Sequence, residues 1–130
     1  MADEMLDIRQ HIRLDMVTSG EETLGWIHSH GMGQFGLPEL EMKHVPLFLM
    51  APAAELLNHI AQCVYDAKDS DHPILLGHNF ATDRYTVVRF VKAKPIPGDE
   101  AHYAYEVWEV VADMGYYAKV CGPCNSTHAN

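Results

Sequence analysis

The chain has 130 residues, 48% of them hydrophobic, which is enough for one ordinary core, so we expect residues 1–130 to form a single domain. Nine basic against eighteen acidic side chains give a net charge of -9, which repels phosphate backbones and anionic membrane surfaces, so we expect neither nucleic acid nor a membrane as partner. An acidic N-terminal segment without an apolar stretch, together with an odd number of cysteines (3), predicts a cytoplasmic protein without a disulfide framework.

The first part of the chain is predicted to be extended. Residues 8–18 alternate partly between apolar and polar side chains, as a strand does, and residues 24–30 are predicted to form the second strand of a hairpin. The glycines of residues 31–36 predict an irregular loop in which the backbone can approach another group closely. Residues 37–49 contain two prolines, which favour an edge strand or an irregular connection over a central strand.

The clearest helix is predicted over residues 52–67, where the apolar side chains fall on one stripe. After it, residues 74–76 predict a short strand, and residues 85–91 and 103–112 predict two stronger strands rich in aromatic and β-branched side chains. The segment 94–99 between them is long enough for an antiparallel connection. This order predicts an α+β fold: a mostly antiparallel sheet with one main amphipathic helix packed on one face.

The most informative motif is a pair of histidines separated by one residue. His28 and His30 lie at the end of a predicted strand, so both imidazoles should project from the same face and can offer two nitrogen ligands to one metal ion. A zinc site with an open position needs a third ligand, and the nearest candidate is Glu41, with Glu39 and His44 as alternatives. Either acid could instead act as the general base for a metal-bound water.

A purely structural interpretation of the same segment stays open. Trp26 and Phe35 would then be core residues, the glycines would shape a tight loop, and His28 and His30 would only form local hydrogen bonds. His78 lies at a loop-like junction before a predicted strand and could join the histidine pair if the sheet brings them together.

The segment Trp-x-His-Ser-His, followed at the right spacing by an acid, resembles the signature of the JAMM (MPN-type) zinc isopeptidases. His28 and His30 match the histidine ligands of that family, Glu41 falls where the family has its aspartate ligand, and Pro38 stands at the position of its serine. The resemblance implies a zinc-dependent hydrolase with a metal site formed by His28, His30 and Glu41. The general-base glutamate of that family lies well upstream, where this chain offers Glu4, Glu21 and Glu22.

A longer segment is similar to uncharacterised bacterial domains of unknown function. In those domains a His-x-His-Gly-Met-x-x-Phe-Gly-x-Pro-Glu-Leu-Glu segment precedes an amphipathic helix, as residues 28–41 precede residues 52–67 here. This resemblance implies no activity, and glycine and proline in such a fingerprint usually define the shape of a loop and not a reaction. The fingerprint residues in this chain are Gly31, Phe35, Gly36, Pro38 and Glu39.

Cys121 and Cys124 form a Cys-Gly-Pro-Cys sequence that resembles the dithiol motif of thioredoxins. Too few residues follow it for the helix that lowers a thiol pKa in that fold, so we expect residues 121–130 to form a flexible tail. With His128 the two cysteines would offer three metal ligands, which is a further alternative.

Three functions follow in order of preference. The first is a small accessory or interaction module without catalysis, which uses an acidic surface and aromatic C-terminal strands to bind a protein partner or a second copy in a homodimer. The second is a zinc-dependent hydrolase that uses His28, His30 and Glu41. The third is a thiol redox protein that uses Cys121 and Cys124.

Overall fold

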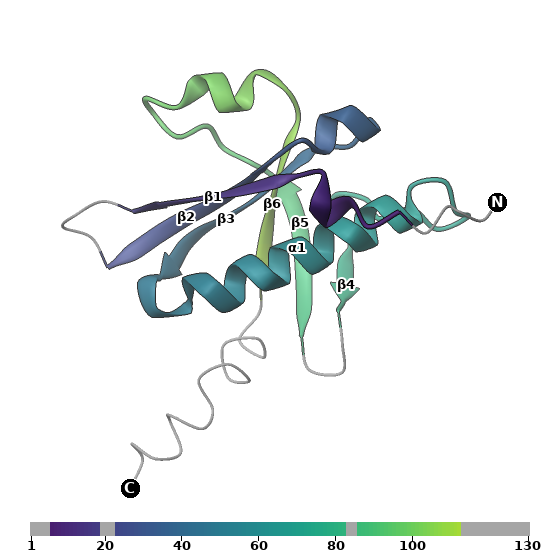
Figure 1. Cartoon of the computed structure of the whole chain (residues 1–130), viewed down its shortest axis with the longest axis horizontal. Helices are drawn as coiled ribbons and strands as arrows, with labels where there is room; N and C mark the ends of the chain where they lie inside the picture. The colour runs from purple at the N-terminus through teal and green to yellow at the C-terminus, as the bar shows by residue number, and fades with distance from the viewer. Residues whose placement is uncertain (1–5, 19–22, 83–85, 113–130) are drawn as a thin grey trace, which may run out of the picture.

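The computed structural model describes residues 6–18, 23–82 and 86–112. Its centre is a six-stranded sheet with one long helix, α1, along one side (Figure 1). The spatial order of the strands is β1-β2-β3-β6-β5-β4. This architecture confirms the predicted α+β class, with a mostly antiparallel sheet and one main amphipathic helix on one face.

The strands fall into two groups along the chain, one before α1 and one after it. The first group is β1 (Arg13–Thr18), β2 (Leu24–His30) and β3 (Glu39–Pro46), and the second is β4 (Asn79–Ala81), β5 (Val87–Lys92) and β6 (Val107–Ala112). Pairing is antiparallel within each group, and the groups are joined by a parallel pairing of β3 with β6. In this pairing Glu39 lies opposite Val107 and Glu41 lies opposite Glu109.

Helix α1 (Met50–Ala67) follows directly on the short 3-10 helix η4 (Leu47–Leu49) and supplies much of the core. Its buried side chains pack with apolar residues of β2, β3, β5 and β6, and they are Met50, Ala53, Leu57, Ile60, Ala61 and Val64. Residues Leu47–Ala67 are long and apolar enough to meet the criteria for a membrane span. Because this helix lies along the sheet and buries its apolar stripe there, we interpret it as the core helix of the domain.

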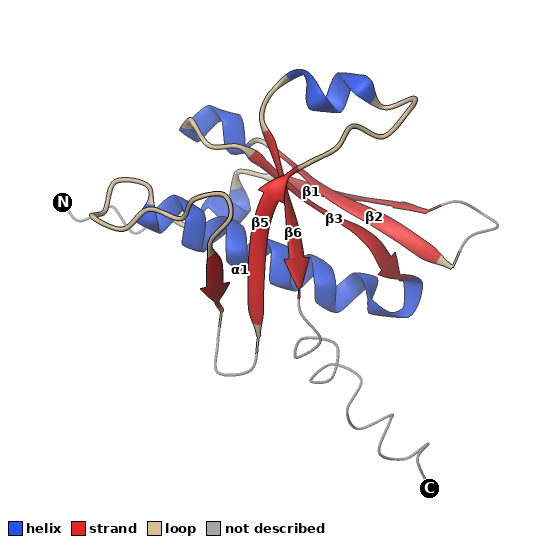
Figure 2. Ribbon diagram, turned by 180° about the vertical axis from the view of Figure 1, so that it is seen from behind, coloured by secondary structure: helices blue, strands red, loops and turns tan. Residues whose placement is uncertain are grey.

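The two faces of β2 have different surroundings. A side chain at Gly25 would collide with Met50 of α1, so Gly25 faces the helix. Since side chains alternate along a strand, Trp26, His28 and His30 project from the opposite face of the sheet. The connection between β5 and β6, which contains the 3-10 helix η5 (Glu100–Ala104), lies on that side of the molecule, away from α1 (Figures 1 and 2).

Two predictions for the first half of the chain were wrong. Residues 8–18 do not form one strand, because the Asp7 side chain accepts a hydrogen bond from the Arg9 backbone and starts the 3-10 helix η2 (Ile8–Gln10) before β1. Residues 37–49 contain a central strand, β3, and not an edge strand or an irregular connection, although β3 carries a bulge in its pairing with β2. The two prolines are tolerated because Pro38 precedes β3 and Pro46 is its last residue.

Two predictions for the second half also need correction. Residues 74–76 form no strand; Leu75 and Leu76 are exposed, and the short strand is instead β4. The strand predicted over residues 103–112 begins only at Val107, because residues 103–104 belong to η5 and residues 105–106 connect it to the strand. The predicted strand at 85–91 corresponds to β5, and its antiparallel pairing with β6 is confirmed.

Candidate metal centre

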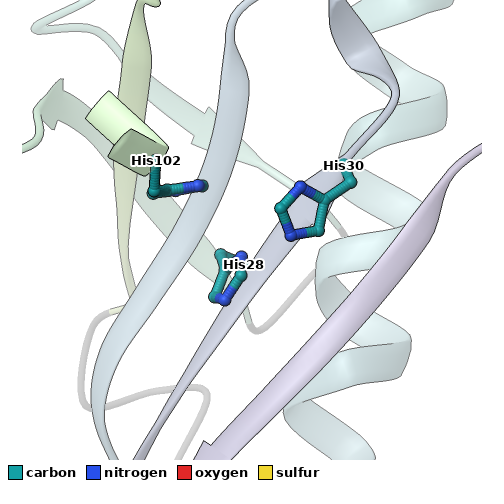
Figure 3. Close-up of side chains that lie close together, drawn as sticks. All are labelled: His28, His30 and His102. Carbon is teal, nitrogen blue, oxygen red and sulfur yellow. The ribbon is translucent and has the colours of Figure 1, made fainter. Parts of the chain in front are cut away.

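Three histidine side chains meet on the sheet face opposite α1. His28 and His30 come from β2 and His102 comes from η5, and one nitrogen from each ring lies within 4.8 Å of the other two. The ring centroids of His28 and His30 are 4.8 Å apart, and those of His28 and His102 are 4.5 Å apart. Figure 3 shows the three rings around a common space. The prediction that both β2 imidazoles share one face is therefore confirmed.

Two of these rings carry buried nitrogens without a hydrogen-bond partner. Among the described residues, His28 Nδ1 and His102 Nε2 are buried and unpaired. Burial lowers the pKa of His28, and the neighbouring His102 and His30 lower it further. Burial is also the main cause that lowers the pKa of His102. Both imidazoles are thus held in the neutral form, whose lone pair a metal ion requires.

The third ring, His30, is held by an acid of the neighbouring strand. Asp15 lies on β1, opposite His28 in the strand pairing, and its Oδ2 lies 3.0 Å from His30 Nε2. Arg13 donates from Nε to Asp15 Oδ1 at 3.0 Å, and this hydrogen bond is the main cause that lowers the pKa of Asp15. A carboxylate that accepts from one ring nitrogen fixes the tautomer and leaves the other nitrogen free for a metal ion.

Glu41, the predicted third ligand, lies beside the cluster with its carboxylate already engaged. It is fully buried on β3, directly opposite His28. Trp26 Nε1 and the Tyr103 hydroxyl both donate to Glu41 Oε1, at 2.9 and 2.8 Å, and Lys43 Nζ lies 3.2 Å from Oε2. Oε1 is 3.7 Å from His102 Nε2. Glu41 therefore links Trp26, Tyr103 and Lys43 beside the histidine cluster.

Tyr103 is a donor in this arrangement rather than an acid. Burial, together with the hydrogen bond to Glu41, raises the pKa of its phenol. The phenol stays protonated at neutral pH and donates its hydrogen bond to Glu41 Oε1. Because Tyr103 follows His102 directly, this hydrogen bond anchors η5 over β2 and β3 and so positions the His102 ring.

Glu39, the other candidate acid, organises the glycine-rich loop. Its carboxylate accepts from Ser29 Oγ at 2.7 Å and from the backbone N–H groups of Gly31, Met32 and Gly33 at 3.2 to 3.3 Å. These donors form the start of the 3-10 helix η3 (Met32–Phe35), where backbone N–H groups otherwise lack partners.

The remaining fingerprint residues also shape this loop. Gly31 and Gly36 flank η3 with positive φ angles of 114° and 74°. Phe35 packs edge-on against Tyr65 of α1, with ring centroids 5.2 Å apart. Pro38 lies between η3 and β3. Their placement agrees with the interpretation that the fingerprint defines a loop shape.

The other sequence candidates lie apart from the cluster or outside the described residues. His44 occupies a β-bulge of β3, with φ 58°, and is exposed. His78 precedes β4 at the far edge of the sheet and is not part of the cluster. Cys121, Cys124 and the predicted tail at 121–130 lie outside the described residues.

His102 is the ligand candidate that sequence reasoning missed. It lies 72 residues after His30, just before the strand predicted over residues 103–112, and no local spacing relates it to the His-x-His pair. The sequence carried only an indirect indication of His102: the connection before the last strand is long enough to reach across the sheet.

The three imidazoles fit a divalent transition metal. Imidazole nitrogen suits zinc, copper, iron and nickel, whereas magnesium and calcium prefer oxygen ligands. Zinc–nitrogen bonds of about 2.0 to 2.1 Å in a tetrahedral site place the nitrogens roughly 3.3 Å apart. The nitrogens lie within 4.8 Å of one another, so side-chain rotation can close the difference. The residues present can therefore hold such an ion.

Comparisons of the chain with models of known protein families, with curated proteins and with solved structures found no match. The resemblances to the JAMM isopeptidases and to the uncharacterised bacterial domains therefore stay predictions.

Proposed function

We propose that this chain is a zinc-dependent hydrolase whose metal ion is held by His28, His30 and His102. The observation that carries the proposal is the meeting of three imidazoles from two distant segments, two of them with buried nitrogens that lack partners. Leaving buried polar nitrogens unpaired costs about 1 to 3 kcal/mol each, and a bound metal ion removes that cost. In this proposal His102, and not Glu41 as predicted from the sequence, is the third metal ligand, and Glu41 supports the site through its hydrogen bonds.

Three protein ligands leave a fourth position for water, as in catalytic zinc sites. Zinc in such a site lowers the pKa of its water to about 7 and polarises a carbonyl group. Solvent reaches the edge of the cluster at His30, whose side chain is 38% exposed. In hydrolysis, the water oxygen bonds to the carbonyl carbon, the bond to the alcohol or amine breaks, and that leaving group takes up a proton.

Metal analysis of untagged protein tests the proposal. We expect one zinc per chain, lost in each of the variants His28→Ala, His30→Ala and His102→Ala. His72→Ala is the matched control, since His72 is an exposed histidine in a loop and should leave the zinc content unchanged. Retention of full zinc in the His102→Ala variant, or no zinc in the parent protein, would refute the three-histidine centre.

A non-catalytic interaction module is the second candidate, and one observation favours it. Strand β1 forms an edge of the sheet, and Met16 on this strand is 56% exposed. An exposed apolar edge strand is a template for pairing with a second chain. Light scattering of the parent and of Met16→Lys tests it: a dimer that Met16→Lys dissociates supports a homodimer, and a monomeric parent removes this support.

A further inference from the structure

A largely apolar cavity lies beside the metal centre. Its volume is about 450 Å³, within the range of about 300 to 1,000 Å³ that is typical of small-molecule sites. It lies between the sheet and the connection that carries η5, and its lining includes Val17, Leu24, Trp26, Lys43, Pro95 and Ile96.

Trp26 belongs both to the cavity and to the surroundings of the metal centre. Its ring lies 4.1 Å from that of His28 and 5.4 Å from that of His102, measured between centroids, and it also lines the cavity. The hydrogen bond from its Nε1 to Glu41 fixes the indole in this place. The cavity therefore begins one indole ring away from the histidine cluster.

The same chain segment closes both features. Residues 94–97 and Asp99 line the cavity, and His102, three residues further on, completes the histidine cluster. Lys43 contacts both the surroundings of the metal centre and the lining of the cavity. Its ammonium group pairs with Glu41 and donates to the Lys94 carbonyl oxygen. A compound bound at the metal ion would therefore meet the Trp26 ring before it reaches the cavity.

We infer that the cavity binds the apolar acyl arm of the substrate, so that the substrate class is a carboxylic ester or amide with a medium-length hydrocarbon chain. This inference rests on the proposed zinc centre. The carbonyl group lies at the metal ion and the chain passes Trp26 into the cavity. Burial of the hydrocarbon chain against Leu24 and Ile96 supplies the affinity, since each buried methylene group adds to binding.

Hydroxamates of two lengths test the inference, because both bind zinc and only one carries a chain long enough to enter the cavity. Acetohydroxamate and octanohydroxamate are titrated calorimetrically into the zinc-loaded protein. We expect octanohydroxamate to bind at least about tenfold more tightly. In Leu24→Glu this advantage should vanish while acetohydroxamate binding persists, which also shows that the variant is folded and holds zinc.

Val111→Glu is the matched control, because Val111 and Leu24 are strand residues of nearly equal exposure, 38% and 39%, and Val111 lies away from this cavity. It should keep the full chain-length advantage.

Should Leu24→Glu lose binding of both hydroxamates, Ile96→Glu replaces it in the same comparison. Equal affinities of the two compounds for the parent, or an advantage that survives both cavity variants, overturn the inference while the zinc centre stands. Absence of zinc overturns the proposed function and this inference together.

Discussion

Asp15 is the residue whose contribution to the histidine cluster is easiest to isolate. It touches His30 through one oxygen and Arg13 through both, so it acts on the metal through the orientation of a ligand. We predict that Asp15→Asn weakens zinc affinity by about 10- to 100-fold, the usual effect of losing such a partner. Competition with a zinc chelator measures this affinity.

The control for this variant is Asp69→Asn. Asp69 pairs with Lys68 at the surface and its side chain is 86% exposed, so the same chemical change there should leave zinc affinity unaltered. An Asp15→Asn protein that binds zinc as tightly as its parent would show that His30 needs no carboxylate partner.

The buried histidines make the stability of the zinc-free protein depend on pH. The folded-state pKa values of His28 and His102 lie below the ordinary value of 6.5, so the unfolded state binds more protons in that range. The free energy of unfolding should therefore be highest above about pH 6.5 and fall as the pH drops below it. Urea unfolding in the presence of a chelator measures the slope.

The double variant His28→Gln, His102→Gln provides the comparison for the pH series. It lacks both shifted groups, so its unfolding free energy should decline less between pH 6.5 and lower pH. Identical slopes for the parent and the double variant would contradict the assignment of neutral, buried imidazoles.

At the residue scale, sequence reasoning predicts what local spacing determines. His28 and His30 are two residues apart on one strand, so their common face follows from strand geometry. His102 could not be found this way, because its place depends on the path of a long connection and on the hydrogen bond from Tyr103 to Glu41. Glu41 was correctly singled out as close to the pair, but its partners come from three separate elements.

Among the elements, η3 has the strictest backbone requirement. At Gly31, φ is 114°, and a side-chain carbon would lie 3.0 Å from the His11 carbonyl oxygen. At Gly36, φ is 74° and nothing lies within 4 Å of such a carbon. We predict that Gly31→Ala destabilises the protein by about 2 kcal/mol or more, and Gly36→Ala by only about 1 kcal/mol.

Urea unfolding of the two glycine variants measures both destabilisations. Both positions have positive φ, but the φ of Gly31 lies further from the left-handed region that alanine tolerates, so the difference reports the collision with the 11–12 segment together with this greater backbone strain. Equal destabilisation by both substitutions would mean that the close approach at Gly31 contributes nothing.

Element positions were predictable wherever the pattern was strong and uninterrupted. Strand β2 matches its predicted residues, and α1 begins two residues before the predicted start. Strand β3 was misassigned because proline was taken to exclude a central position, whereas its prolines lie before the strand and at its end. Tyr103 and Tyr105 have strand-type side chains, but the contact of Tyr103 with Glu41 overrides that local preference.

At the scale of the whole molecule, the proposed zinc ion links the two halves of the chain. Its proposed ligands come from β2 and from the connection between β5 and β6, so the complete set of three histidines exists only in the folded chain. We predict that free zinc at 100 times its Kd raises the free energy of unfolding by about 2.7 kcal/mol. Urea unfolding with zinc and with a chelator measures the difference.

His102→Ala is the control for zinc stabilisation. Without the ligand from the second half of the chain, zinc should leave the unfolding midpoint almost unchanged. Stabilisation of this variant equal to that of the parent would place the ion elsewhere.

The parallel pairing of β3 with β6 also determines when the site can exist during folding. Each group of three strands can form from sequence neighbours, whereas the two groups meet only after the chain has passed through α1 and back across the sheet. Contacts between residues far apart in sequence close slowly, so this junction is expected to be the late step. The proposed zinc site is therefore complete only when the junction has formed, and a zinc-sensitive dye added during refolding would time the docking of the two halves rather than the formation of either one.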